Sequence, residues 1–178
     1  KWYTAPMEID MISTSPTPLL ISPTIRTNVP GTVLKAGNGY YNSAGDLLFY
    51  IADGNIYDYN NTIMSPIRGG GTEIIVLPFE TNNNCQSKYS VFITTGGFTS
   101  ASSLWQYIVD MKSMTVTEVY VDQISYNGSP STEYGAIALS KPNPASSNDR
   151  YLYFLAGPGT IGAANGGQIN KIIIHNNG

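Results

Sequence analysis

The stretch of residues 42–64, NSAGDLLFYIADGNIYDYNNTIM, constrains the fold more than any other part of the chain. It contains two β-prone runs, Leu47–Ala52 and Asn55–Tyr59, joined by Asp53 and Gly54. Asp-Gly between such runs is a strong hairpin signal, because both central residues of a type I′ turn adopt positive φ. The Asn, Gly and Asp residues on either side favour further turns. The stretch therefore predicts a turn–strand–turn–strand–turn unit.

Composition and the other apolar runs extend this prediction to an all-β fold. Charged residues make up 12% of the 178 residues, against roughly 25% in an average soluble domain. Thirteen tyrosines and 18 glycines take part of their place, together with many β-branched residues. No stretch combines helical apolar spacing with capping residues. Further strands are expected at Glu73–Phe79, Lys88–Thr95, Leu104–Met111, Thr115–Gln123, Tyr134–Leu139, Arg150–Ala156 and Gln168–His175.

Three segments repeat one form, an aromatic-rich strand followed by a glycine-bearing connection and a second strand. Their anchors Phe49, Phe92 and Phe154 lie 43 and 62 residues apart. The first spacing matches the roughly 40–45 residues of a four-stranded propeller blade. We therefore expect β-propeller-like blades of antiparallel strands over about residues 40–80, 88–123 and 134–178, with a β-sandwich of similar hairpins as the alternative.

The ends of the sequence favour a piece of a longer protein. The chain starts without methionine at Lys1, and it stops at Asn177-Gly178, a hairpin-turn pair that follows a strand-like run. Residues 1–178 are accordingly expected to form a single all-β domain or a fragment of a larger propeller.

Charge and residue content exclude several classes of function. The net charge is −3 and the nine Lys and Arg residues are scattered, which disfavours nucleic acid as a partner. No apolar run approaches the roughly 20 residues needed to cross a bilayer. One histidine, His175, and one cysteine, Cys85, make a nucleophilic triad or a zinc site improbable. Asp46 and Asp53 occupy turn positions, where aspartate usually hydrogen-bonds the local backbone rather than acting in acid–base catalysis. We expect no enzymatic activity, cofactor or metal.

Aromatic side chains point to binding instead. The strands and loops carry more Tyr and Trp than a single core requires, and such rings stack on sugars or on flat protein surfaces. We predict that Trp105, Tyr126 and Tyr134 border a surface binding site.

Parts of the sequence also resemble a known family. The runs AGDLLFYIADGNIYDYNNTIM, EIIVLPF and KYSVFITT…LWQYIVDM, with Lys1-Trp2-Tyr3 near the start, resemble the N-terminal β-propeller-like domains of large secreted surface proteins of Bacteroidetes-type bacteria. Chains of that family often continue to a C-terminal type IX secretion sorting domain. The resemblance covers roughly residues 40–120. It implies an extracellular or cell-surface location and an adhesive or interacting role, and it provides no catalytic residues.

Together these observations predict a non-catalytic extracellular β-domain that mediates adhesion, protein–protein interaction or self-assembly. A carbohydrate-binding module with a glycan partner is the first alternative, and a fragment of a secreted hydrolase is the second.

Overall fold

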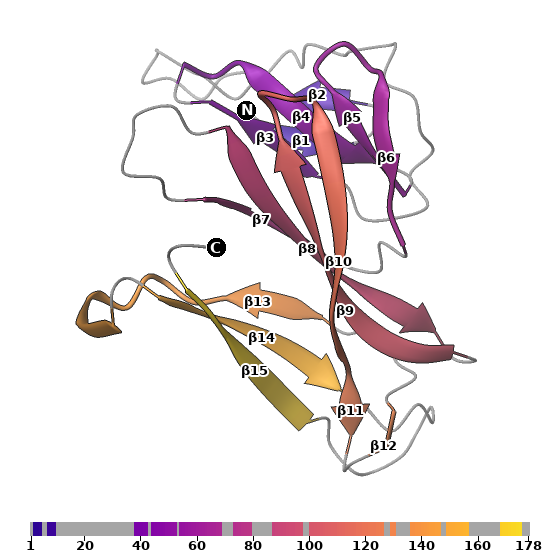
Figure 1. Cartoon of the computed structure of the whole chain (residues 1–178), viewed down its shortest axis with the longest axis vertical. Coiled ribbons are helices and arrows are strands. Elements are labelled where there is room, and N and C mark those ends of the chain that lie inside the picture. The colour runs from indigo at the N-terminus through magenta and orange to yellow at the C-terminus, as the bar shows by residue number, and fades with distance from the viewer. Residues whose placement is uncertain are drawn as a thin grey trace, which may run out of the picture. The chain divides into compact units, whose positions relative to one another are not determined.

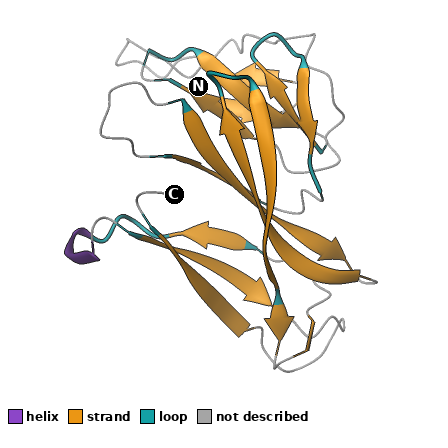
Figure 2. Ribbon diagram, viewed as in Figure 1, coloured by secondary structure: helices purple, strands orange, loops and turns teal. Residues whose placement is uncertain are grey.

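The computed structural model describes twelve segments of the chain (Figure 1): residues 2–4, 7–9, 38–42, 44–52, 54–68, 73–79, 87–97, 100–126, 129–130, 136–146, 149–156 and 168–175. The chain divides into two compact units, Lys1–Ile67 and Arg68–Gly178. The described residues form antiparallel strands and one short 3₁₀ turn, Pro144–Ser146 (Figure 2). The prediction of an all-β protein is confirmed.

The first unit contains a two-stranded and a four-stranded sheet. Their strands are β1 (Trp2–Thr4) and β2 (Met7–Ile9), then β3 (Asn38–Tyr41), β4 (Leu47–Ala52), β5 (Asn55–Asp58) and β6 (Ile63–Pro66). The second of these sheets has the order β3-β4-β5-β6, so every strand pairs with its neighbour in sequence. Ala52 pairs with Asn55, which leaves a two-residue connection. Its Gly54 has φ +78°, as a hairpin turn of this length requires. The predicted hairpin is therefore confirmed.

Two turns flanking this hairpin share one hydrogen-bond pattern. In residues 42–46 the Asn42 amide donates to the Asp46 carbonyl at 2.9 Å, and Asn42 Oδ1 accepts from the Asp46 amide at 2.8 Å. In residues 58–62 Asp58 makes the same two bonds with Thr62, at 2.9 and 2.8 Å. The fourth residue of each turn has positive φ, 87° at Gly45 and 68° at Asn61. Asp46 thus lies in a turn as predicted, but the side chain that accepts the backbone hydrogen bond belongs to Asn42.

Apolar residues on both faces bury the central strand β4. Phe49 and Ile51 lie on one face, Tyr50 and Ala52 on the other, and all four are buried. Tyr50 stacks on Tyr57 of β5 with ring centroids 4.8 Å apart. A run of apolar residues without alternation is typical of a strand covered on both sides.

The second unit contains a four-stranded sheet, a small hairpin and a three-stranded sheet. Their strands are β7 (Ile74–Pro78), β8 (Lys88–Gly97), β9 (Ser100–Asp110) and β10 (Thr115–Gln123), then β11 (Ser125–Tyr126) and β12 (Ser129–Pro130), then β13 (Ile137–Leu139), β14 (Arg150–Ala156) and β15 (Gln168–Ile174). Again each sheet pairs consecutive strands in order.

Three local features of this unit differ from the sequence prediction. The strand β7, which the spacing had grouped with the preceding hairpin, pairs with β8. A bulge between Tyr120 and Asp122 interrupts the regular alternation expected along β10. Residues expected to form only a loop after Gln123 include the short hairpin β11–β12.

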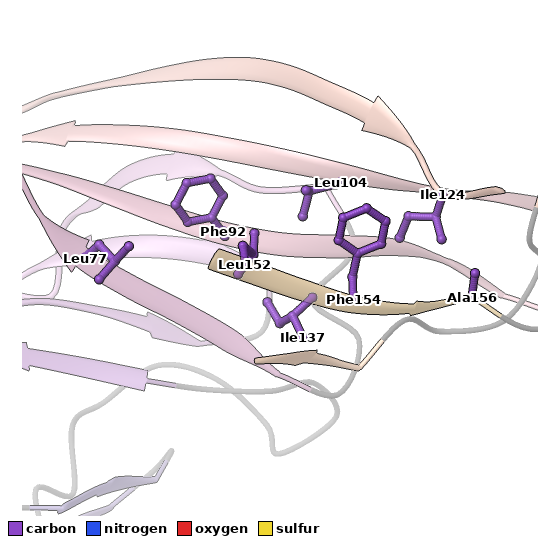
Figure 3. Close-up of a cluster of buried hydrophobic side chains, with 8 residues drawn as sticks. All are labelled: Leu77, Phe92, Leu104, Ile124, Ile137, Leu152, Phe154 and Ala156. Carbon is purple, nitrogen blue, oxygen red and sulfur yellow. The ribbon is translucent and has the colours of Figure 1, made fainter. Parts of the chain in front are cut away.

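One hydrophobic core joins the two larger sheets of the second unit (Figure 3). Phe92 of β8 and Leu104 of β9 pack with Leu152 and Phe154 of β14, and all four side chains are buried. The strands β7 and β13 also lie close to each other. Burial of each such side chain contributes about 1.5–3 kcal/mol. One face of the three-stranded sheet packs against this core. The alternate residues of β14 lie on the opposite face of the sheet.

Candidate functional site

Two surfaces of the second unit gather side chains that could bind a partner. The first is a group of five residues at the β9–β10 pair, which we call the Arg68 cluster: Arg68, Trp105, Tyr107, Glu118 and Tyr120. In the β9–β10 register, Trp105 lies opposite Tyr120 and Tyr107 lies opposite Glu118. Directly opposed residues of an antiparallel pair share a face of the sheet. The register therefore places four of the five side chains on one face.

Hydrogen bonds centred on Tyr107 connect the cluster. The buried Tyr107 hydroxyl donates to Glu118 Oε2 at 2.7 Å and accepts from the Arg68 amide at 2.8 Å. The Arg68 Nε donates to Glu118 Oε1 at 2.9 Å, so both carboxylate oxygens are used. The pKa of Glu118 lies below its usual value, because the Tyr107 hydroxyl and then the Arg68 guanidinium stabilise the carboxylate. Burial raises the pKa of Tyr107, which keeps its hydroxyl protonated as a donor.

The ring of Trp105 forms the floor of the cluster. The Arg68 Cζ lies 4.6 Å from the centroid of this ring, within the range of a cation–π contact. The Tyr120 ring meets it edge-on, with centroids 5.2 Å apart and planes at 75°. Trp105 is partly buried, whereas Tyr120 is 52% exposed. A ligand at this surface would therefore meet Arg68 and Tyr120 before it met the indole.

The three residues predicted from the sequence are not equally described. Trp105 has a described side chain and lies in the Arg68 cluster. Tyr126 lies in β11, and its side chain is outside the described residues, as is the whole of Tyr134. Sequence reasoning missed Arg68, Glu118 and Tyr120. The alternation along β10 places Glu118 and Tyr120 on one face, but only the β9–β10 register shows that this face is that of Trp105.

The second surface is the face of the three-stranded sheet opposite its core, which we call the outer face. It consists of alternate residues of β14 and β15: Tyr151, Tyr153, Leu155, Ile169, Lys171 and Ile173. The strand register pairs them directly across the two strands. Three aliphatic side chains are solvent-exposed, Leu155 at 39%, Ile169 at 72% and Ile173 at 52%.

The polar atoms of the outer face lie at its centre and at one end. The Lys171 Nζ lies 4.9 Å from the ring centroid of Tyr151, and the Tyr151 and Tyr153 rings are 6.3 Å apart. Beyond Ile173, His175 Nδ1 lies 3.1 Å from Asp149 Oδ2. The rest of the face is aliphatic and aromatic.

Burial along β14 differs from that along the other central strands. In β8, six consecutive residues from Tyr89 to Thr94 are buried, and in β4 five of six are. In β14, burial alternates, with Leu152, Phe154 and Ala156 buried and the residues between them partly or largely exposed. Its sequence, RYLYFLA, begins with an arginine and has two tyrosines, whereas β4, LLFYIA, has one tyrosine and otherwise only apolar residues. The strand thus has Leu152, Phe154 and Ala156 on its covered face, and Tyr151, Tyr153 and Leu155 on its less covered face.

The described residues form neither a metal site nor a membrane-spanning helix. No group of three or more His, Cys, Asp and Glu side chains there is placed to hold a metal ion. Within the same part of the chain, no helix has the length and hydrophobicity to cross a membrane. Cys85 lies outside the described residues.

The chain was also compared with known proteins. No protein-family model, curated protein or solved structure matches it.

Proposed function

We propose that the chain is a non-catalytic, propeller-like domain of a secreted or cell-surface bacterial protein, and that it acts in adhesion or assembly through protein–protein contact. The order of its strands supports the propeller-like arrangement. The sheets β3–β6, β7–β10 and β13–β15 are successive meanders of four, four and three strands. Each meander follows the previous one along the chain, which is how propeller blades are built.

The observation that carries the proposal is the exposed outer face. The exposed fractions of Leu155, Ile169 and Ile173 together exceed one and a half whole side chains. Burying that much aliphatic surface contributes about 2–5 kcal/mol, before the neighbouring tyrosine rings are counted. Contiguous apolar patches on one face of a sheet typically mark contact sites for other proteins.

The occupant that fits this face is another β-sheet, supplied by a second copy of the chain. Within the second unit, the opposite face of the same three strands already packs against a four-stranded sheet through Leu152 and Phe154. Aligned sheets pack about 10 Å apart with interdigitating side chains. A second sheet on the outer face would give β14 the double cover that β4 and β8 have.

Self-association of the purified chain tests the proposal. We expect the mean mass in sedimentation equilibrium to rise with protein concentration. Ile173→Asp places a charge among the exposed apolar side chains of the contact and should return the protein to a monomer. Ile63→Asp is the matched control, because Ile63 is 55% exposed on the edge strand β6 of the first unit. It should leave the association unchanged.

Two results would refute this function. One is a monomer at every concentration. The other is an equal effect of the Ile173 and Ile63 substitutions, because association would then not depend on the outer face.

A further inference from the structure

The guanidinium of Arg68 is held in a fixed orientation at the surface. Its Nε donates to Glu118, its Cζ lies over the Trp105 ring, and the backbone amide of the same residue donates to the Tyr107 hydroxyl. Two contacts thus hold the side chain and a third holds its backbone, although 61% of the side chain remains exposed. Part of the rotamer entropy that an arginine normally loses on binding a ligand has therefore already been lost.

The two terminal nitrogens of Arg68 are available to bind a ligand. Of the three guanidinium nitrogens of Arg68, only Nε has a hydrogen-bond acceptor among the described residues. The two Nη atoms form the planar fork that matches a carboxylate in bidentate geometry. Because the fork is already oriented, an anion arriving from solvent meets a formed site.

The exposed ring of Tyr120 lies next to this fork. Arg68 and Tyr120 both contact the Trp105 ring, at 4.6 and 5.2 Å from its centroid. The guanidinium carbon and the Tyr120 centroid are therefore at most about 10 Å apart, a span that a disaccharide covers. An exposed aromatic ring offers an apolar surface on which a sugar ring can stack.

The charge of the cluster selects among anions. The Glu118 carboxylate balances the positive charge of Arg68, and the whole chain carries a net charge of −3. Neither favours a dianionic phosphate or a densely charged polyanion. A ligand with a single carboxylate meets less electrostatic repulsion, and the fork can still bind that carboxylate through two hydrogen bonds.

We propose that the Arg68 cluster is a binding site for uronic-acid sugars, with the Arg68 fork on the carboxylate and the Tyr120 ring against the sugar. Glu118, Tyr107 and Trp105 act as positioning residues that hold the guanidinium. This site is separate from the outer face of β14 and β15, and it does not depend on self-association.

The probe is a disaccharide with one galacturonate residue and hence one carboxylate, titrated by calorimetry against the whole chain. The uncharged galactose disaccharide is the reference sugar, and we expect binding of the uronate and none of the reference. Arg68→Lys keeps the charge but loses the fork, and it should weaken binding about tenfold or more. Tyr120→Ala should weaken binding as well, because it removes the stacking ring.

Arg150→Lys is the matched control. The Nη1 of Arg150 donates to the Ser140 carbonyl at 3.2 Å, in the three-stranded sheet. This variant should bind as the parent does, and thermal melts should show that all variants are folded. The proposal is overturned by absence of binding, by equal binding of the uncharged disaccharide, or by an Arg68→Lys affinity equal to that of the parent. Equally tight binding of an oligoglutamate peptide would also overturn the sugar assignment.

Discussion

Replacing Tyr107 by Phe removes one oxygen atom from the centre of the Arg68 cluster and leaves the ring in place. In the parent protein that oxygen accepts from the Arg68 amide at 2.8 Å and donates to the Glu118 carboxylate at 2.7 Å. The residue is fully buried, and the substitution creates almost no cavity because it removes only the hydroxyl oxygen. The effect on stability therefore reports the two hydrogen bonds.

The free energy that each of the two hydrogen bonds contributes depends on whether its partner is charged. A hydrogen bond to a charged group contributes about 1.5–3 kcal/mol, and a neutral one about 0.5–1.5 kcal/mol. Glu118 is 34% exposed at its side chain, so water recovers part of the first term. We expect Tyr107→Phe to lower the free energy of unfolding by about 2 kcal/mol. With a urea m value of about 2 kcal/mol/M, the midpoint should fall by about 1 M.

Urea unfolding followed by tryptophan fluorescence measures this change. The chain has two tryptophans, Trp2 in the first unit and Trp105 in the second. A Trp2→Phe background leaves Trp105 as the reporter of the unit that contains Tyr107. Tyr120→Phe is the control, because its exposed hydroxyl makes no hydrogen bond within the described segments, and it should change stability by less than about 0.5 kcal/mol.

The pH dependence provides a second readout. The native pKa of Glu118 is lowered, so its carboxylate contributes stability above the ordinary glutamate pKa and loses it as the pH falls through the native value. The Tyr107 hydroxyl is the largest cause of this lowering. The stability difference between the parent and Tyr107→Phe should therefore be largest at neutral pH and narrow in acid. A difference below about 0.5 kcal/mol at neutral pH, or one that widens in acid, would refute the reasoning.

Two further predictions concern the turns. Met114 closes the β9–β10 hairpin with φ 56° and is 40% exposed, so Met114→Gly should stabilise the protein by about 0.5–1 kcal/mol in thermal or urea unfolding; Met114→Ala keeps the Cβ, and an equal gain from it would contradict this explanation. Asp58 Oδ1 accepts from the Asn60 and Thr62 amides, both at 2.8 Å, so Asp58→Ala should cost about 1–2 kcal/mol in the same assay. Asp58→Asn keeps an acceptor oxygen and should cost less stability than Asp58→Ala. An equal loss of stability would show that the two hydrogen bonds to Oδ1 are not the cause.

Local signals made much of the fold predictable. The hairpin at Gly54 follows from a dipeptide whose backbone preference is decided within a few residues. The strand Arg150–Ala156 was expected with the limits that the structure has, because glycine and polar loops bound an apolar run. Pro78 ends β7 as expected, since proline lacks the amide that a further strand bond would need.

Contacts between distant segments were not predictable in the same way. Arg68 reaches Glu118 and Trp105 across 50 and 37 positions of sequence, and no local pattern encodes that meeting. The bulge between Tyr120 and Asp122 likewise follows from how β10 pairs with β9. The one-sided burial of β14 is also not encoded locally, because large side chains occupy both faces of the strand and only the structure shows which face is covered. The sequence therefore predicts Trp105 as a binding residue from its aromatic character, but it does not predict which residues surround it.

The pairing of consecutive strands in every described sheet also bears on how the chain folds. Pairings between neighbours in sequence close short loops, which lowers the contact order and speeds folding relative to other β topologies. Each meander can form its strand pairs as soon as its own residues have been synthesised, before the residues of the later meanders follow. Amide exchange during refolding should therefore protect β4 and β5 together, as one step, and β8 and β9 as another.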